Sequence, residues 1–325
     1  MNYIETAKQY TGNDVESIFF RPILTGPGAQ ELGVRVLYNM PLPTTVQLWD
    51  VNTNLLKKLT TNGWSGGQPA AKFEKTIPME RVKAEIGFSA ADYFSLVYEQ
   101  ISARSDVNMQ DLTGTILEQA ETELFKQNIA ENLRVTMWLG DTSLTSGFNT
   151  FNGFLSSIKD AVEDDMINYQ TYSAAEVETP EGVIELFDKL WNISDQRMKS
   201  LRSEGQLAFF CSSDIYFQYE KYLDSMGVES SFRSTVEGQP TLAYHGIPII
   251  DPGLGRYLPM TAQHQSFVLL TDRRNLVMAV NTADMPGNEV RMWYNPDEME
   301  NRQRAVFMAG CEILDEELLS YAYRV

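Results

Sequence analysis

The residues best suited to chemistry are few and far apart in this chain. It contains two histidines, His245 and His264, and two cysteines, Cys211 and Cys311. Histidine is the side chain that titrates near neutral pH, and metal sites need His and Cys at short, repeated spacings that are missing here. Both cysteines lie in apolar, strand-like runs, which favours buried free thiols over a disulfide or a metal pair. We therefore expect no catalytic, cofactor-binding or metal-binding residues.

Two short motifs resemble functional sites but lack their essential partners. Ser156-Ser157-Ile158-Lys159 fits the pattern Ser-x-x-Lys, yet the Ser-Asp-Asn and Lys-Thr-Gly motifs that would accompany it do not occur. The stretch from Asp50 begins like a calcium-binding EF-hand loop, but Leu55 stands where that loop needs glycine and Thr61 where it needs glutamate. Hence we expect neither an enzyme nor a calcium-binding protein.

The composition indicates a large globular protein with an acidic surface. Of 325 residues, 43% are hydrophobic and 22% are charged, which is enough to bury the cores of about two domains. Asp and Glu number 44 against 26 Lys and Arg, a formal net charge of −18, whereas proteins that grip nucleic acid concentrate cations on one surface. The apolar runs are too short to span a membrane, and the N-terminus lacks the pattern of a signal peptide. We expect a protein made in the cytosol, without a membrane span.

The most prominent predicted element is a long helix. Between Met109 and Leu139 there is no proline and a single glycine, Gly114. At about 1.5 Å per residue such a helix would be roughly 45 Å long. Because its second apolar row starts one residue after the first row ends, we expect the two halves to pack against different elements. A structural strut and an ordinary long core helix of an enzyme fit the segment equally well. The rows are Leu112, Ile116, Ala120 and Leu124, then Phe125, Ile129, Leu133 and Met137.

The first hundred residues differ in kind from the rest. Residues 1–33 alternate turn signals with short apolar pieces and are predicted to form an extended arm. Alternating patterns predict strands at 34–38, 45–49, 75–77 and 81–88, around a turn-rich tip. A hairpin with so little core of its own is marginal in water, so we expect it to rest on a neighbouring molecule. Packing on its own domain is the alternative.

The remaining residues predict a mixed α and β unit followed by strands. Thr179-Pro180-Glu181 has the cap, proline and acid typical of a helix start, and the helix is expected to continue to Gly205. A buried strand at 207–211 and a helix capped by Ser212 or Ser213 follow. Further strands are predicted at 247–250, 267–270, 276–280, 290–294 and 304–314, the last nearly reaching the C-terminus. The predicted fold class is α+β.

The order of these parts resembles the major capsid proteins of tailed bacteriophages, which have the Hong Kong 97-type fold. The resemblance rests on the arm, the hairpin closed by 75–88, and the long helix that ends in the Leu-Gly-Asp of 139–141. It also rests on Phe151-Asn152-Gly153-Phe154-Leu155 and on a pattern "leucine, x, x, x, glycine, x, proline" at 242–248. It covers essentially the whole chain, although each motif is degenerate.

The resemblance implies a division of the chain into regions. These are an N-terminal arm (1–33), a region containing an extended loop (34–88), a peripheral domain with the spine helix at about 106–140 (89–169), an axial domain (170–262) and closing strands of the peripheral domain (263–325).

It also implies a structural function. The chain would assemble into hexamers and pentamers that form an icosahedral head shell in the host cytoplasm, and the virion shell would enclose double-stranded DNA without specific binding. Portal, scaffolding and decoration or head-completion proteins would be its partners. An encapsulin nanocompartment shell protein and a cytosolic α/β enzyme or ligand-binding protein are the alternatives. The candidate inter-subunit contacts are Phe19, Phe20, Trp49, Leu55, Leu56, Trp64 and Phe73.

Overall fold

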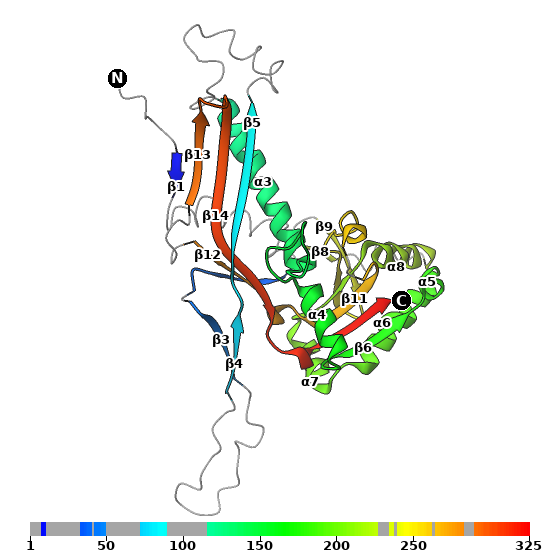
Figure 1. The fold of residues 1–325 in the computed structure, drawn as a ribbon. Helices are drawn as coiled ribbons and strands as arrows, with labels where there is room; N and C mark the ends of the chain where they lie inside the picture. The colour runs from blue at the N-terminus through cyan, green and yellow to red at the C-terminus, as the bar shows by residue number, and fades with distance from the viewer. Residues whose placement is uncertain are drawn as a thin grey trace, which may run out of the picture.

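The computed structural model describes residues 8–10, 33–40, 42–49, 72–89, 116–226, 234–236, 239–261, 264–282 and 289–325. Within them, two β-sheets and their helices form the body, and a two-stranded ribbon extends from it (Figure 1). The fold class is α+β, as the sequence predicts. None of the described helices is both long enough and apolar enough to cross a membrane.

A long, bent strand, β14, organises the first sheet. Its residues 300–306 pair with β13 and its residues 308–313 pair with β12, while β5 pairs with the other edge. Strand β1 then adds to β13, and β2 adds to β12. Figure 1 shows β14 running along the length of the sheet. The strands are β1 (Lys8–Tyr10), β2 (Arg35–Tyr38), β5 (Glu80–Ser89), β12 (Leu276–Asn281), β13 (Glu289–Asn295) and β14 (Glu300–Ile313).

Helix α3 (Ile116–Leu139) lies along this sheet. Its row Phe125, Ile129, Leu133 and Met137 is buried in one core with apolar residues of β5, β13 and β14. The predicted end at Leu139 is confirmed, and the predicted part before residue 116 lies outside the described residues. Leu124 belongs to the predicted first row and is 51% exposed. The expected change of packing partner along the helix is therefore not seen within the described side chains.

A close approach of two backbone segments holds the C-terminal end of α3. The N–H of Gly153 donates to the carbonyl oxygen of Gly140 (2.8 Å), and the Ser156 hydroxyl donates to the same oxygen. A Cβ atom on Gly140 would lie 2.6 Å from the Thr136 carbonyl oxygen and closer still to that of Phe151. Glycine is needed here because there is no room for a side chain. The Leu-Gly-Asp of 139–141 and the Phe-Asn-Gly-Phe-Leu of 151–155 are two of the motifs behind the resemblance, and they contact each other here.

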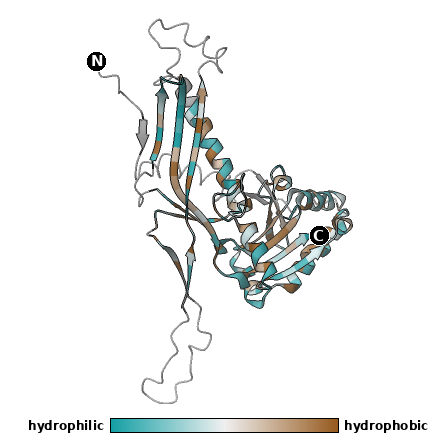
Figure 2. Cartoon of the chain, in the orientation of Figure 1, coloured by the Kyte–Doolittle hydropathy of each residue, from teal (hydrophilic) through white to brown (hydrophobic). Residues whose placement is uncertain are grey.

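The second sheet has seven strands in the order β6-β15-β11-β7-β10-β9-β8. Its central strands β7 and β11 are buried along their whole length, which matches their unbroken apolar sequences. One face packs against helices α6 and α8, and the other against α4 and the end of α3. Figure 2 shows hydrophobic residues along these strands. The strands are β6 (Asn168–Tyr172), β7 (Leu207–Cys211), β8 (Ser234–Val236), β9 (Gln239–Tyr244), β10 (Ile247–Ile250), β11 (Phe267–Asp272) and β15 (Leu319–Arg324).

The predicted helix from 180 to 205 is wrong in one respect, because it is broken. Helix α6 begins after Thr179, which caps it as predicted by accepting from the Gly182 N–H. It ends at Ser194, whose hydroxyl donates to the Leu190 carbonyl oxygen, and Asp195 caps a new helix by accepting from the Arg197 N–H. Side-chain hydrogen bonds at these two polar residues compete with helix continuation. The helices are α4 (Phe154–Glu163), α5 (Ala174–Val177), α6 (Pro180–Ile193), α7 (Gln196–Ser200) and α8 (Ser213–Ser225), with 3₁₀ turns at Leu201–Glu204, Leu258–Met260, Arg273–Asn275 and Glu316–Leu318.

The C-terminal strands also differ from the prediction. β14 ends at Ile313, and an unpredicted strand, β15, follows it. β15 and β11 pair with each other in the seven-stranded sheet, whereas β12, β13 and β14 belong to the six-stranded sheet. The predicted boundary at 263 therefore places β11 and β15 with the wrong sheet. A strand sequence indicates burial and pairing but not which of two sheets it joins.

Substituting Gly140 with alanine tests the backbone contact. We expect Gly140→Ala to lower the free energy of unfolding by about 3 kcal/mol, because the new Cβ forces α3 and the 151–153 segment apart. Chemical denaturation followed by circular dichroism measures this. Gly255→Ala is the matched control, since its Cβ would meet only the Ser213 side chain at an ordinary 3.4 Å. Equal stability of the two variants would contradict the interpretation.

Candidate assembly interface

The predicted contact residues divide between the ribbon and segments that are not described. Strands β3 (Thr44–Trp49) and β4 (Lys72–Ile77) pair antiparallel, with Leu48 opposite Phe73 and Trp49 opposite Lys72. Trp49 and Phe73 therefore lie close together near the far end of the described ribbon, and the pairing of β3 with β4 confirms a hairpin there. The predicted strands 34–38 and 81–88 instead pair with β12 and β14 of the same chain, which agrees with the alternative of packing on its own domain. Leu55, Leu56, Trp64, Phe19 and Phe20 lie outside the described residues.

The root of the ribbon is anchored to the body by a small apolar cluster. Val46 and Ile77 are buried against Val277, Ala279 and Leu314. Strand β12 contributes two of these residues, so the ribbon starts from the six-stranded sheet. The ribbon is thus fastened at its root and projects beyond the body (Figure 1).

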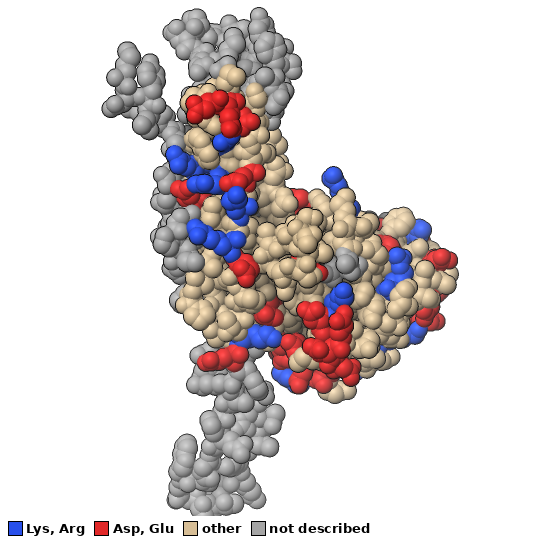
Figure 3. Space-filling view, in the orientation of Figure 1, with Lys and Arg blue, Asp and Glu red and all other residues tan. Residues whose placement is uncertain are grey.

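Lys75 adds a polar anchor at the same root. Its ammonium nitrogen lies 2.9 Å from Glu316 Oε1 and 3.9 Å from Glu312 Oε1. Partial burial alone would lower the pKa of Lys75, but the hydrogen bond to Glu316 and the surrounding carboxylates raise it. Burial raises the pKa of Glu312 above its ordinary value, against the opposing charge of Lys75. Figure 3 shows acidic side chains gathered on the body beside this root.

The N-terminal arm contributes one described strand. β1 pairs antiparallel with β13, with Lys8 opposite Met292 and Tyr10 opposite Val290. The extended conformation predicted for the arm is therefore seen at residues 8–10, where it covers one edge of the six-stranded sheet.

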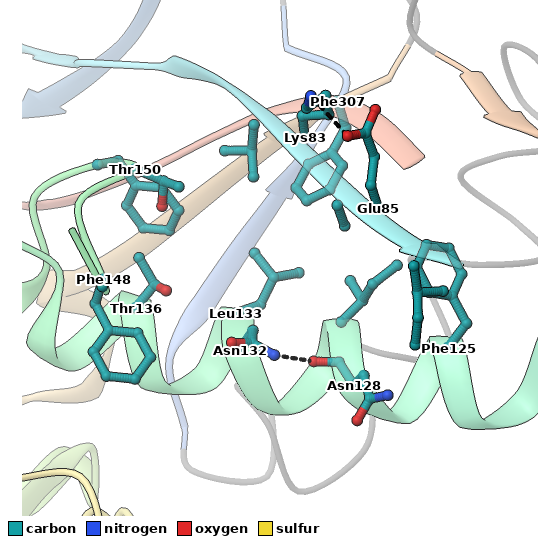
Figure 4. A pocket seen from close by; sticks show the side chains of 16 residues that line it. Lys83, Glu85, Phe125, Asn128, Asn132, Leu133, Thr136, Phe148, Thr150 and Phe307 are labelled. Carbon is teal, nitrogen blue, oxygen red and sulfur yellow. Dashed lines mark hydrogen bonds and ion pairs between the residues drawn. The ribbon is translucent and has the colours of Figure 1, made fainter. Parts of the chain in front are cut away.

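A groove lies between β5 and α3, beside the six-stranded sheet. Its volume is about 410 Å³, and Figure 4 shows its floor of apolar side chains, among them Phe125, Leu133 and Phe307. The loop carrying Phe148 and Thr150 closes one end. The sequence does not predict this groove, because β5, α3 and the loop at 147–151 come together only in the folded chain.

The walls of the groove suit an extended peptide. Asn128, Asn132 and Thr136 lie at four-residue spacing along α3, about 6 Å apart. A strand repeats every two residues, about 6.6 Å, so a peptide in the groove would meet a polar side chain at nearly every repeat. Lys83 and Glu85 also line the groove and neutralise each other at 2.8 Å. In the described part of the chain no strand pairs with the edge of β5 opposite β14.

The described serine and cysteine side chains nearest the end of α3 make structural contacts. The Ser156 hydroxyl is buried and donates to the Gly140 carbonyl oxygen, which is a structural role. Burial raises the pKa of the Cys311 thiol, which donates to the Asn152 carbonyl oxygen (2.9 Å). No group of three or more His, Cys, Asp or Glu side chains in the described ranges is placed to hold a metal ion.

The arrangement of bent strand, spine helix, second sheet and projecting ribbon is the Hong Kong 97-type capsid fold. Solved structures with this arrangement include a chain of the satellite phage P4 procapsid that includes the size determination (Sid) protein. That chain is 10% identical, with 94% of this chain and 97% of that chain covered and a TM-score of 0.56. The capsid of the native GTA particle is 13% identical, with coverages of 100% and 96% and a TM-score of 0.54.

An encapsulin shares the fold as well. The holo-SrpI encapsulin complex from Synechococcus elongatus PCC 7942 is 11% identical, with 99% of this chain and 92% of that chain covered and a TM-score of 0.51. No protein-family model matches the sequence, and no curated protein matches it. At these identities the likeness establishes the fold.

The buried carboxylate at the ribbon root predicts a pH dependence of stability. Because the folded-state pKa of Glu312 is raised, ionising it opposes folding, and its cost grows as pH rises from about 4 through the folded-state pKa. We expect Glu312→Gln to become more stable relative to the wild type over that range, since glutamine keeps the shape without the charge. Urea denaturation at several pH values measures this. A variant that is less stable than the wild type at pH 7 would show that the attraction to Lys75 outweighs burial.

Proposed function

We propose that this chain is the major capsid protein of a tailed phage, a structural protein whose copies form hexamers and pentamers of an icosahedral head shell. The observation that carries the proposal is that the fold matches shell proteins over nearly the full length of both chains. The function of such a protein lies in contacts between copies, which suits a chain with a projecting ribbon and a groove that no described side chain fills.

The geometry of one copy supports a particular contact between copies. Residues 50–71 connect β3 to β4, and the described residues on either side of them, Trp49 and Lys72, lie at the far end of the ribbon from the groove (Figure 1). Residues 50–71 contain Lys57 and Lys58 and one acidic residue, Asp50, in a chain of net charge −18. The small positive charge of this segment favours its approach to an acidic second copy. The loop of one copy would rest in the groove of the next, with Leu55, Leu56 and Trp64 as anchors.

Such a contact is heterologous and can close into a ring. Each copy offers its loop to one neighbour and its groove to the other, so a closing rotation gives a capsomer. In this proposal 1–33 is the arm, and 170–262 together with β11 and β15 forms the axial domain. Portal, scaffolding and decoration or head-completion proteins would complete the head in the host cytoplasm. The shell would enclose double-stranded DNA without binding it specifically.

The encapsulin fold of one neighbour supports a second candidate function. Expression of the chain alone distinguishes the two, with size-exclusion chromatography and negative-stain microscopy as the measurements. For a phage capsid protein we expect capsomers or head-sized shells without cargo. Small closed shells that hold an enzyme would favour the encapsulin, and a monomer that forms neither capsomers nor shells under any condition would contradict both.

A cysteine pair tests where the loop docks. We expect Leu55→Cys combined with Asn128→Cys to form covalent multimers under oxidation, because one copy's loop lies in its neighbour's groove. The native cysteines are fully or nearly fully buried, so they do not interfere. Leu55→Cys with Gln127→Cys is the control, since Gln127 is adjacent on α3 but does not line the groove. Denaturing electrophoresis without reductant reads the result. Equal cross-linking of both pairs, or a disulfide within single chains, would contradict docking between copies.

A further inference from the structure

Arg134 connects the spine helix to the turn that follows β10. It lies on α3, its side chain is 17% exposed, and its Nη1 donates to the carbonyl oxygens of Pro252 (2.5 Å) and Gly253 (3.3 Å). That turn follows a strand of the seven-stranded sheet, whereas α3 lies along the six-stranded sheet and packs only its C-terminal end against the seven-stranded one. The guanidinium therefore spans the junction between the two sheets of the molecule.

Glu131 holds this guanidinium and closes a ring of contacts. Its two carboxylate oxygens accept from Nε (3.2 Å) and Nη2 (2.7 Å) of Arg134, one turn along the same helix. Its Oε1 also accepts from the Tyr257 hydroxyl (2.8 Å), which belongs to the segment after the turn. Burial alone would raise the pKa of Glu131, but the hydrogen bonds from Arg134 and Tyr257 lower it on balance, so the carboxylate stays ionised. Helix α3 thus contacts the turn through Arg134 and the segment after the turn through Glu131.

The turn is built to present its carbonyl oxygens to Arg134. Asp251 Oδ1 accepts from the Gly253 N–H (2.7 Å), which folds the turn back on itself. Gly253 has φ of +69°, and a Cβ there would lie 2.6 Å from Arg134 Nη1. The positive φ favours glycine here, and a Cβ at this position would push the guanidinium away from the turn. Tyr257 also packs edge to face on Phe148, with ring centroids 5.8 Å apart.

Apolar packing and this polar ring have different effects on the junction. Leu254 and Leu258 are buried in the core shared with α3 and α4, which holds the parts together. Apolar contact is non-directional, so it tolerates small rotations. A planar guanidinium bound to a carboxylate and to two successive carbonyl oxygens is directional, and lysine cannot reproduce that fork. The ring is the directional element between α3 and the turn.

We propose that the Arg134–Glu131 fork on the turn at Pro252 and Gly253 fixes the angle between the spine helix and the seven-stranded sheet, and through it the curvature and size of the shell. Each copy repeats this angle, and a repeated heterologous contact closes only for particular rotations. If this angle varied slightly in every copy, the variations would add up around the shell and give shells of different diameter. The proposal rests on the shell function proposed above.

Shell diameter is the first measurement. We expect Arg134→Gln to form shells with a diameter distribution at least twofold broader than the wild type, and Arg134→Lys to lie between the two, by negative-stain microscopy. Arg302→Gln is the matched control, because Arg302 pairs with Glu300 within the same sheet and spans no junction. Diameters unchanged from the wild type in Arg134→Gln, or equal broadening in Arg302→Gln, would overturn the proposal.

A second measurement, on unassembled protein, tests the angle between α3 and the seven-stranded sheet independently of shell formation. Spin labels at Gln127→Cys on α3 and Glu185→Cys on α6, both exposed positions, report the angle as a distance distribution. We expect a narrow distribution in the wild type and a broad one in Arg134→Gln. A distribution unchanged by the substitution would overturn the fork as the positioning device. If the wild type forms no shells, the proposed function fails, and this distance measurement still decides whether Arg134 positions the sheet.

Discussion

The structure depends on one tightly packed crossing, where the end of α3 meets the backbone of 151–153. The Gly153 N–H donates to the Gly140 carbonyl oxygen, and the Cys311 thiol of β14 donates to the Asn152 carbonyl oxygen. Trp138 is fully buried beside this crossing, and its ring centroid lies 5.4 Å from that of Phe154 and 5.3 Å from that of Phe210. Spine helix, bent strand and seven-stranded sheet therefore meet where two backbone segments approach closely and where large aromatic side chains are buried.

The crossing is part of the main apolar core of the body, whereas the ribbon has only a small apolar cluster at its root. The ribbon is fastened by Val46, Ile77 and the ion pair of Lys75 with Glu316. Beyond that root a two-stranded ribbon gains little stability from itself. The groove beside β5 has the opposite character, an apolar floor with no described side chain filling it. One molecule thus has a projection in need of a surface and a surface able to receive one, which is the basis of the proposed assembly.

Much of the fold could be predicted from local patterns. The apolar row from Phe125 to Met137 and the cap and proline at Thr179 and Pro180 have local causes, and the structure confirms both elements. The break at Ser194 was missed because serine and aspartate hydrogen bonds compete with an apolar stripe that continues past them. The assignment of β11 was wrong because its run of apolar residues is compatible with the interior of either sheet. For the candidate contacts, the structure describes the backbone of Trp49 and Phe73 and leaves the other five as predictions.

The sequence by itself determined the α+β class, the end of the long helix at Leu139, the pairing of strands around 45–49 and 75–77, and the scarcity of residues suited to catalysis. These follow from periodicity, capping and composition, which are properties of neighbours in the chain. Only the tertiary structure decided that Gly140 touches Phe151 and Gly153, that Arg134 reaches Pro252, and that β5 and α3 enclose a groove. Those contacts join residues that are distant in sequence or that are brought together by the course of a loop. Their energies depend on distances and directions that no local sequence pattern encodes.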